Sequence, residues 1–561
     1  MCIRDSIIHN AKIIADTSEI IAPATALAVQ GDKVLAIGND AQIKALRGAH
    51  TNLIDANGRL ILPGFHDSHV HLAEGAVELT QLRLNDCKNK SEILANTKEY
   101  LAKHTKLKEL IGNGLSLPAL KDSQISRLDL DAINSSMPIF IYAEDGHCAW
   151  LNSKALERIK PSDLEKFSKT KEAEKLADGT FSGVLREEGL SLLENAIVGP
   201  TRKERAKALR DTLKLAHSFG ITSIQDAHAT KPVLDAYMDL ARANALTMRV
   251  VACLHTAPGS GQVQLQRLLR ERNYYQHKML RANNAKIFAD GVIETGTAAM
   301  LNPYLNNPAN RGLANYSEIE MNDLVDTLAR NRFNIHIHAI GDRAVRQALD
   351  ALSAVRTFSQ RDDLRHQIAH LECVDNLDRR RFAHLDITAN FESYWAFRDP
   401  YVEQLTVPVL GGERAKDIYP LGSIAKTGAR LAAGSDWTVS TLNPLCAMQV
   451  AVTRQPLDDK NKEPLNENER VDLASILSAY TIGGAHVNHS EEETGSLTPG
   501  KYADFVIFDK DFTTGSPYDI AKSKVMATYV GGVRVFCDPA FVLSINPLRT
   551  SETVKSKSKT K

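Results

Sequence analysis

Short apolar runs recur through the middle of the chain, and longer charged segments of helical character separate them. Seven runs follow the segment "LPGFHDSHVHL" at 62–72, namely "ITSIQDA" from Ile221, "MRVVACL" from Met248, "AKIFAD" from Ala285, "NIHIHAI" from Asn334, "HQIAHL" from His366, "DITANF" from Asp386 and "RLAAGSD" from Arg430. With the opening segment they make eight candidate strands. Eight strands that alternate with helices predict an α/β fold, a (β/α)8 TIM-like barrel whose active site lies at the carboxyl ends of its strands.

The two ends of the chain carry a different pattern, in which β-branched runs are broken by Gly, Asp and Asn turns. It extends from Ile7 to Leu62 and returns in "GSLTPGKYADFVIFD" and "KVMATYVGGVRVFC", at 495–509 and 524–537. Two such segments most simply build one small discontinuous β-sandwich. We therefore predict a sandwich from 1–62 and 486–545, a barrel at 63–485 and a disordered polar tail at 546–561.

The stretch from about 73 to 201 interrupts the repeat of the barrel. It is long, charged and helix-rich in pattern, and it contains "IFIYAEDGHCAWLNSKAL". Long segments that do not fit the repeat of a fold commonly serve as lids, so we predict an insertion over the mouth of the barrel. The run "IFIYA" is itself strand-like, which leaves the strand count open by one.

Composition narrows the class of protein. The chain has 561 residues, 43% of them hydrophobic, and its 68 basic and 68 acidic residues are scattered. This balance does not indicate a nucleic-acid groove or an anionic membrane surface. We therefore expect a small-molecule substrate, with no nucleic-acid partner and no membrane partner, and a homodimer stays open.

The compartment follows from what the sequence lacks. No apolar run reaches the roughly 20 residues that span a bilayer, and the seven cysteines have no C-x-x-C spacing, so we expect a cytoplasmic protein with reduced thiols. The opening "MCIRDS" does not lead naturally into the strand-like "IIHNAKIIA". These six residues are therefore open to interpretation as a sequence-assembly artefact, in which case a native N-terminal signal would be missing.

The segment "PGFHDSHVH" concentrates three histidines and one aspartate. Side chains two apart share one face of a strand, so Asp67, His69 and His71 point one way and His66 points the other. Imidazole nitrogens suit zinc and similar divalent ions, and catalytic sites combine them with oxygen ligands and an open position. An H-x-H pair alone is more often a pair of core or surface residues.

Other candidate strands supply matching side chains. His338, His370 and Asp436 lie at the ends of the fifth, sixth and eighth candidate strands, and Lys286 lies on the fourth. Strand ends converge at the mouth of a barrel, so these side chains should meet there. His336 lies deeper along its strand, and we predict that it is a core histidine.

Six motifs occur in order along the chain: "PGFHDSHVH", "KIFADG", "HAIGDRAV", "RHQIAH", "AAGSDW" and "GSLTPGKYADFVIFD". Together they resemble the amidohydrolase superfamily and, within it, the family 3 or YtcJ-like branch. The resemblance extends from about Ile7 to Phe541. It implies a (β/α)8 barrel with a composite β-sandwich, and hydrolysis of carbon–nitrogen bonds, commonly amides, with one or two divalent metals.

The resemblance also implies roles for single residues. His69 and His71 would hold the more buried metal, and His338 and His370 would hold the second. Asp436 would bind metal and serve as the general base.

Lys286 requires a chemical argument of its own. An ammonium group cannot ligate a cation, but a lysine amine that takes up carbon dioxide becomes an anionic carbamate with two oxygens, suited to bridging two metals. The resemblance implies such a carboxylated Lys286. The alternative is an unmodified Lys286 paired with Asp290 beside a single metal.

Further residues are assigned to the surroundings of the site. We predict that Asp67 orients a ligand histidine and that Asp226, closing the second strand, lines the pocket. Glu294 should lie near the mouth. His147 belongs to a segment that covers the substrate in relatives, where it either contacts substrate or holds the lid together. His366 precedes its strand and is expected to be exposed.

The sequence thus predicts a metal-dependent hydrolase of non-peptide carbon–nitrogen bonds, such as amides, N-formyl or N-acyl groups. One or two divalent ions, with zinc expected, would activate water to hydroxide. Fold and ligands do not fix the scissile bond, so a deaminase of cyclic amidines and an esterase or lactonase are alternatives. A non-catalytic binding protein with a relict site is a remote alternative.

Overall fold

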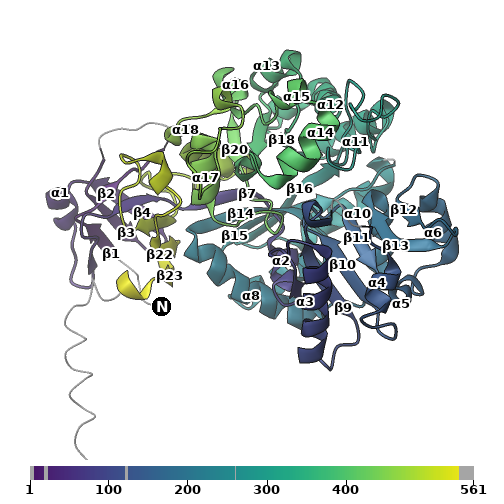
Figure 1. Cartoon of the computed structure of the whole chain (residues 1–561). Coiled ribbons are helices and arrows are strands. Elements are labelled where there is room, and N and C mark those ends of the chain that lie inside the picture. The colour runs from purple at the N-terminus through teal and green to yellow at the C-terminus, as the bar shows by residue number, and fades with distance from the viewer. Residues whose placement is uncertain (1–5, 18–22, 121–123, 260, 542–561) are drawn as a thin grey trace, which may run out of the picture.

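The computed structural model describes residues 6–17, 23–120, 124–259 and 261–541 (Figure 1). The predicted tail at 546–561 and the first five residues of "MCIRDS" lie outside the described residues.

An eight-stranded parallel sheet forms the centre of the molecule, in the order β20-β19-β18-β17-β16-β15-β14-β7. Its strands are β7 (Phe65–Val70), β14 (Ile221–Ala229), β15 (Arg249–His255), β16 (Leu280–Phe288), β17 (Asn334–Ala339), β18 (Gln367–His370), β19 (Thr388–Phe391) and β20 (Leu431–Ala433). The first and last strands, β7 and β20, also contact each other, which makes a nearly closed TIM-like barrel. The eight strands predicted from the sequence are confirmed.

Helices follow the strands along the chain. They are α2 (Leu72–Glu78), α8 (Arg202–Ser218), α9 (Lys231–Arg242), α10 (Gly261–Tyr274), α11 (Glu318–Arg330), α12 (Asp342–Arg361), α13 (Asn376–Leu385), α16 (Leu421–Lys426), α17 (Pro444–Thr453), α18 (Leu473–Ser478) and α19 (Gly484–Val487). Helix α11 shows how the sequence sets such a boundary: Ser317 accepts from the Glu320 amide at 3.3 Å, and the Glu320 carboxylate accepts from the Ser317 amide at 2.9 Å. This reciprocal capping satisfies two amides that a helix start leaves unpaired.

Segments from both chain ends form two further sheets beside the barrel. The four-stranded sheet has the order β4-β3-β1-β5 and the five-stranded sheet the order β2-β6-β21-β22-β23. Their strands are β1 (Ser6–His9), β2 (Lys12–Ile13), β3 (Ala26–Gln30), β4 (Lys33–Gly38), β5 (Asn52–Asp55), β6 (Leu60–Pro63), β21 (Phe505–Phe508), β22 (Val525–Val530) and β23 (Val533–Cys537), with helix α1 (Asp40–Lys44) after β4. One apolar cluster contains side chains of both sheets, such as Leu27 and Phe505.

The insertion lies at the opposite side of the barrel from the chain-end sheets (Figure 1). Its described residues contain five α-helices, as its helix-rich pattern predicted, and also a mixed six-stranded sheet, β12-β13-β11-β10-β9-β8, which was not predicted. The strands are β8 (Leu82–Arg83), β9 (Leu110–Leu115), β10 (Ile139–Ala143), β11 (Cys148–Leu151), β12 (Ala173–Lys175) and β13 (Phe181–Arg186), and the helices are α3 (Lys90–Lys103), α4 (Arg127–Asp131), α5 (Ser153–Leu156), α6 (Pro161–Ser168) and α7 (Leu193–Ala196). The run "IFIYA" becomes β10 of this sheet, because it pairs with β9 and β11 rather than with the barrel.

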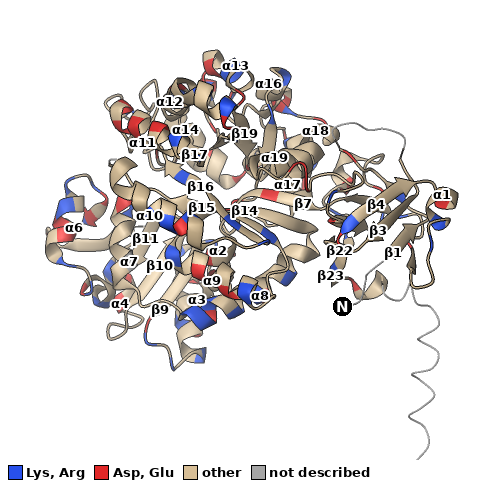
Figure 2. Cartoon of the chain, turned by 180° about the vertical axis from the view of Figure 1, so that it is seen from behind, with Lys and Arg blue, Asp and Glu red and all other residues tan. Residues whose placement is uncertain are grey.

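Three features bear on the class of protein. Within the described ranges, no helix has the length and apolar character that crossing a membrane requires. The cysteines at 87, 148, 253, 373, 446 and 537 are free, as predicted. Basic and acidic residues are both scattered over the elements of the molecule (Figure 2).

Candidate active site

Three predicted side chains meet where the first and last barrel strands end. The Asp436 Oδ1 atom lies 3.1 Å from His71 Nε2 and 3.7 Å from His69 Nε2. One ligand atom from each of His69, His71 and Asp436 lies within 4.8 Å of the others. This donor set of two imidazoles and a carboxylate could hold one divalent ion.

The chain beyond β20 reaches these histidines because its residues are small. A Cβ atom at Gly434 would lie 2.6 Å from His69 Cβ, so only glycine permits this approach. The Asp436 amide donates to the His69 carbonyl at 2.7 Å. Asp67 accepts from the Ser435 hydroxyl at 2.6 Å, from the Ser435 amide at 3.0 Å and from the His69 amide at 3.3 Å. Asp67 thus positions the loop that carries Asp436, and its bonds go to Ser435 and a backbone amide instead of the histidine ring we predicted.

Electrostatics keep Asp436 ionised. Burial raises the pKa of this carboxyl, but the hydrogen bond and charge of His71, followed by the charges of His370 and Lys286, outweigh burial and leave the pKa below its ordinary value. The backbone of Asp436 has φ of 48°, and that of His370 has φ of 77°. Both residues therefore adopt the left-handed conformation, which non-glycine residues rarely do and which is concentrated at functional sites.

A second group of donors lies beside the first. His370 Nδ1 is 2.9 Å from Glu392 Oε2, and His69 Nδ1 is 3.4 Å from Glu392 Oε1. These three residues also offer ligand atoms within 4.8 Å of one another. The sequence prediction missed Glu392, although the signal was present: Glu392 directly follows "DITANF", as Asp436 follows its own strand.

Lys286 is fully buried among these donors, with its Nζ atom 3.2 Å from His69 Nε2. Burial lowers the pKa of Lys286 to about 8, although the charge of Asp436 acts in the opposite direction. The expected alternative, a pair with Asp290, is wrong for the described structure. Asp290 instead accepts backbone N–H bonds at 2.8–3.0 Å from Ala299, Ile340 and Gly341.

Three further histidines of the barrel lie outside these two groups of donors. The ring of His338 lies 4.5 Å from that of His370, but its Nε2 atom is 3.4 Å from the Gly291 carbonyl. His336 contacts His69 Nδ1 at 3.0 Å from inside the barrel. His366, expected to be exposed, is buried, and the hydroxyl of Ser359 on α12 satisfies its Nε2 atom at 2.6 Å.

A cavity of about 1590 Å³ opens over the donors, and the insertion supplies part of its wall. His147 lines this wall and lies 2.7 Å from Glu187 Oε2 through its Nδ1 atom. Burial lowers the pKa of His147, but the charge and hydrogen bond of Glu187 outweigh it and raise the pKa to about 9. Glu294 also lines the cavity, as predicted, whereas Asp226 is turned away and accepts from the Tyr237 hydroxyl at 2.6 Å.

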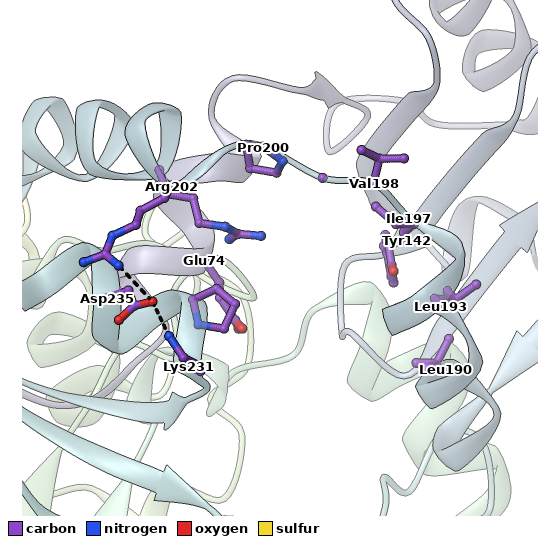
Figure 3. A pocket seen from close by; sticks show the side chains of 13 residues that line it. Glu74, Tyr142, Leu190, Leu193, Ile197, Val198, Pro200, Arg202, Lys231 and Asp235 are labelled. Atoms are coloured by element: carbon purple, nitrogen blue, oxygen red, sulfur yellow. Dashed lines mark hydrogen bonds and ion pairs between the residues drawn. The ribbon is translucent and has the colours of Figure 1, made fainter. Parts of the chain in front are cut away.

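A smaller cavity of about 610 Å³ adjoins the first at the border between the insertion and the barrel (Figure 3). Figure 3 shows Arg202, Lys231 and Asp235 on the barrel side and the apolar Leu190 and Ile197 facing them from the insertion. Leu190 and Ile197 line both cavities. The two cavities are therefore neighbours at this border.

Comparison with known proteins adds independent findings. The model of the amidohydrolase family matches residues 52–536. Protein LONG AFTER FAR-RED 3 of Arabidopsis thaliana is 27% identical over 95% of this chain and 92% of its own length. The putative amidohydrolase YtcJ of Bacillus subtilis is 25% identical over 91% and 96% of the two chains, and the N-substituted formamide deformylase of Arthrobacter pascens is 24% identical over 91% and 94%.

A solved structure supports the fold. An uncharacterized metal-dependent hydrolase of Pyrococcus horikoshii superposes with a TM-score of 0.74, at 23% identity, over 91% of this chain and 99% of that one. At this identity the likeness concerns the fold alone.

Proposed function

The chain belongs to the amidohydrolase family and is a hydrolase, and from that premise we propose that it hydrolyses a non-peptide carbon–nitrogen bond with the help of bound metal. The observation that carries the proposal is the convergence of His69, His71 and Asp436 within 4.8 Å. We further propose N-formyl or N-acyl amines as substrates, because a relative that covers nearly the whole chain is named an N-substituted formamide deformylase.

The donor atoms fit a divalent ion. Asp436 Oδ1 faces the Nε2 atoms of His69 and His71, and His370 Nδ1 faces the Glu392 carboxylate; all of these residues but His71 are buried. Each group brings ligand atoms of three residues within 4.8 Å of one another, which is the arrangement that a divalent ion requires. Imidazole and carboxylate together suit zinc. When bound, such an ion would polarise the scissile carbonyl and lower the pKa of a water molecule.

The side chains of this protein would do the remaining work. We assign Asp436 as the general base that takes a proton from the attacking water and returns it to the leaving nitrogen. Because the pKa of Asp436 is lowered, its carboxylate is unprotonated at neutral pH and can accept that proton. The insertion, with His147 in the cavity wall, would limit the access of bulk water.

We also propose that a carboxylated Lys286 joins a first ion at His69 and His71 to a second at His338 and His370. The support is geometric: Lys286 is fully buried, its Nζ atom lies beside a ligand histidine, and no carboxylate among the described residues forms an ion pair with it. A single ion at His69, His71 and Asp436, with an unmodified lysine, is the alternative.

We extend the proposal to the domains, the compartment and the partners of the protein. The two chain-end sheets would form one β-sandwich domain from 1–62 and 486–545, next to the barrel at 63–485. We propose a cytoplasmic protein that acts on a small molecule, with no nucleic-acid or membrane partner. We also propose zinc as the bound ion and a homodimer as the assembly.

The deciding experiment loads the protein with zinc and bicarbonate and screens N-formyl, N-acyl, carbamate and cyclic amide compounds. Cyclic amidines and esters belong in the same screen, because deamination and ester hydrolysis would use the same donors. We expect turnover of a carbon–nitrogen substrate that His71→Ala abolishes together with bound metal. Turnover that survives in a metal-free His71→Ala protein would refute the proposal, and hydrolysis of esters alone would replace it.

A further inference from the structure

One wall of the main cavity is strongly acidic and has no part in the chemistry described above. Five carboxyl side chains line it, from four different segments of the chain: Glu144 and Asp145 after β10, Glu294 after β16, Glu372 after β18, and Asp399 in the loop after β19. The metal donors line the same cavity. A single substrate can therefore reach both.

No cationic side chain of the described residues forms an ion pair with any of these five carboxyls. Their hydrogen-bond donors are neutral: the Asn85 amide for Glu144 at 3.2 Å, the Thr406 hydroxyl for Glu294 at 2.5 Å and the backbone amide of Val402 for Asp399 at 2.8 Å. The charge of Lys462 lowers the pKa of Asp399, but Lys462 forms its ion pair with Glu403. Burial raises the pKa of Glu144 to about 7 and that of Asp399 to about 6, and no ion pair of the described residues offsets this effect, so a bound cation would favour the ionised form of both carboxyls.

Glu372 gives the independent sign of a missing ligand. Its side chain lines the cavity and is only 4% exposed, and although the Tyr419 side chain lies beside it, its Oε2 atom makes no hydrogen bond within the described structure. A buried carboxylate oxygen with no partner is costly, and such groups in native proteins normally have a partner. A ligand with positive charge or N–H donors would supply it.

Aromatic side chains surround the acidic wall. Trp395, Phe397, Tyr401 and Tyr419 line the same cavity. The charges of Asp145, Glu144 and Glu294 act with burial to raise the pKa of Tyr401. Those of Glu372, Glu294 and Asp399 act in the same way on the pKa of Tyr419. Both rings therefore lie close to these carboxyls. Aromatic faces attract organic cations within about 6 Å, and proteins use this combination to bind ammonium groups.

The spacing of these five carboxyls argues against a separate metal site in the acidic wall. Three groups of residues in the described structure bring ligand atoms within 4.8 Å of one another, and none of them contains Glu144, Asp145, Glu294, Glu372 or Asp399. A small ion needs its ligands at about 2.0–2.6 Å. Carboxyls spread around an aromatic wall suit a larger cation with dispersed charge.

We propose that this wall binds a cationic group of the substrate, so that the preferred substrates are N-formyl or N-acyl derivatives of an amine that carries a second, positively charged nitrogen. The inference rests on the proposed function for the scissile bond. In the reaction, the oxygen of water joins the acyl carbon, the carbon–nitrogen bond breaks, and the nitrogen takes up a proton, which gives a carboxylic acid and a diamine. Glu294 is a specificity residue here, because it lies beyond the metal donors.

Binding without turnover provides the first test. Calorimetric titration of the zinc-loaded protein with hexyltrimethylammonium, which cannot ligate metal, is compared with titration with 1-hexanol. We expect the cation to bind at least tenfold more tightly, and Glu294→Gln and Asp399→Asn to remove that advantage. Glu271→Gln is the matched control, because Glu271 lies on α10 outside the cavity and pairs with Arg267 at 2.7 Å.

Turnover provides the second test. The formamide of 1,5-diaminopentane and N-hexylformamide have tails of equal length, and only the first ends in a charge. We expect kcat/KM at least tenfold higher for the charged substrate, falling toward parity in Glu294→Gln, while the neutral substrate changes less than threefold. Circular dichroism confirms that each variant is folded, and Asp399→Asn, which can still accept the Val402 amide, replaces Glu294→Gln if that protein does not fold.

The outcomes separate the two proposals. Cation binding that depends on Glu294, without hydrolysis of either formamide, supports the acidic subsite and removes the proposed function. Hydrolysis of both formamides at equal rates, with no binding of the ammonium probe, overturns the subsite and leaves the proposed function standing. Calcium binding that Glu294→Gln abolishes, in the absence of ammonium binding, also overturns it.

Discussion

Replacing Asp436 by Asn removes one proton acceptor from the centre of the site and changes little else. Asn keeps the shape of the side chain and one oxygen ligand. Because Asp436 has φ of 48°, the substitution must tolerate the left-handed conformation, and Asn does so better than most residues. Asp436 also does not cap the helix that follows, since α17 begins at Pro444 and Asn443 accepts from the Leu445 amide at 3.1 Å. Asp436→Asn therefore cannot be silent on the ground that Asp436 serves only as a helix cap.

The size of the effect follows from the role of the carboxylate. Asp436 Oδ1 is 3.1 Å from His71 Nε2, and its pKa is held below the ordinary range, so the group is ionised in the resting enzyme. Loss of a general base costs roughly 10² to 10⁴ in kcat, which corresponds to about 3 to 5 kcal/mol of transition-state free energy. We expect KM and bound metal to change much less.

The assay compares steady-state kcat with metal content by plasma mass spectrometry, on the substrate found by the screen. Asp342→Asn is the matched control, because Asp342 accepts from the Leu301 amide at 2.7 Å outside the cavity and Asn can keep that bond. A kcat for Asp436→Asn within about threefold of the wild type, with full metal content, would refute the assignment of this carboxylate as the base.

Three further substitutions test the surroundings of the base. Lys286→Ala should reduce bound metal by one ion or more per chain, measured by mass spectrometry, and unchanged stoichiometry would contradict the bridging carbamate. His147→Ala should raise KM and leave bound metal unchanged, and loss of metal would instead place His147 among the ligands. The KM of the wild type should rise as the pH passes about 9, where His147 loses its proton and its ion pair with Glu187. Gly434→Ala should cost about 1–3 kcal/mol of folding stability and reduce both metal and turnover without altering a donor, since the new Cβ would meet His69 Cβ at 2.6 Å; normal activity and stability would show that the loop can move aside.

The barrel could be predicted from the sequence because its strands are buried on both faces. Buried parallel strands appear as short continuous apolar runs, and runs such as "NIHIHAI" and "HQIAHL" correspond to β17 and β18. The rule that sites lie at strand ends then brought His338, His370 and Asp436 together. The same rule applies to Glu392, which directly follows the run "DITANF".

The insertion could not be predicted in the same way. Its strands are two to six residues long, and β10 must pair with β9 and β11 across turns and helices of varied length. Local pattern cannot specify such pairings, because the stabilising contacts are between residues distant in sequence. Trp150 illustrates the consequence: it is buried in the insertion core and donates to the Ser126 carbonyl at 2.8 Å, a contact between strands and loops that the local pattern does not reveal.

The position of the site at the seam of the barrel explains why its residues are so far apart in sequence. His69 and His71 belong to the first strand and its end, and Asp436 follows the last, so the two sets of donors meet only where β7 and β20 close the sheet. The seam is held by the Asp67 bonds to Ser435 and by the amide of Asp436 on the His69 carbonyl. A barrel that fails to close therefore has no metal site, and an ion bound across the seam would stabilise the closed barrel by its own binding free energy. Closure of the fold and assembly of the catalytic donors are one structural event in this protein.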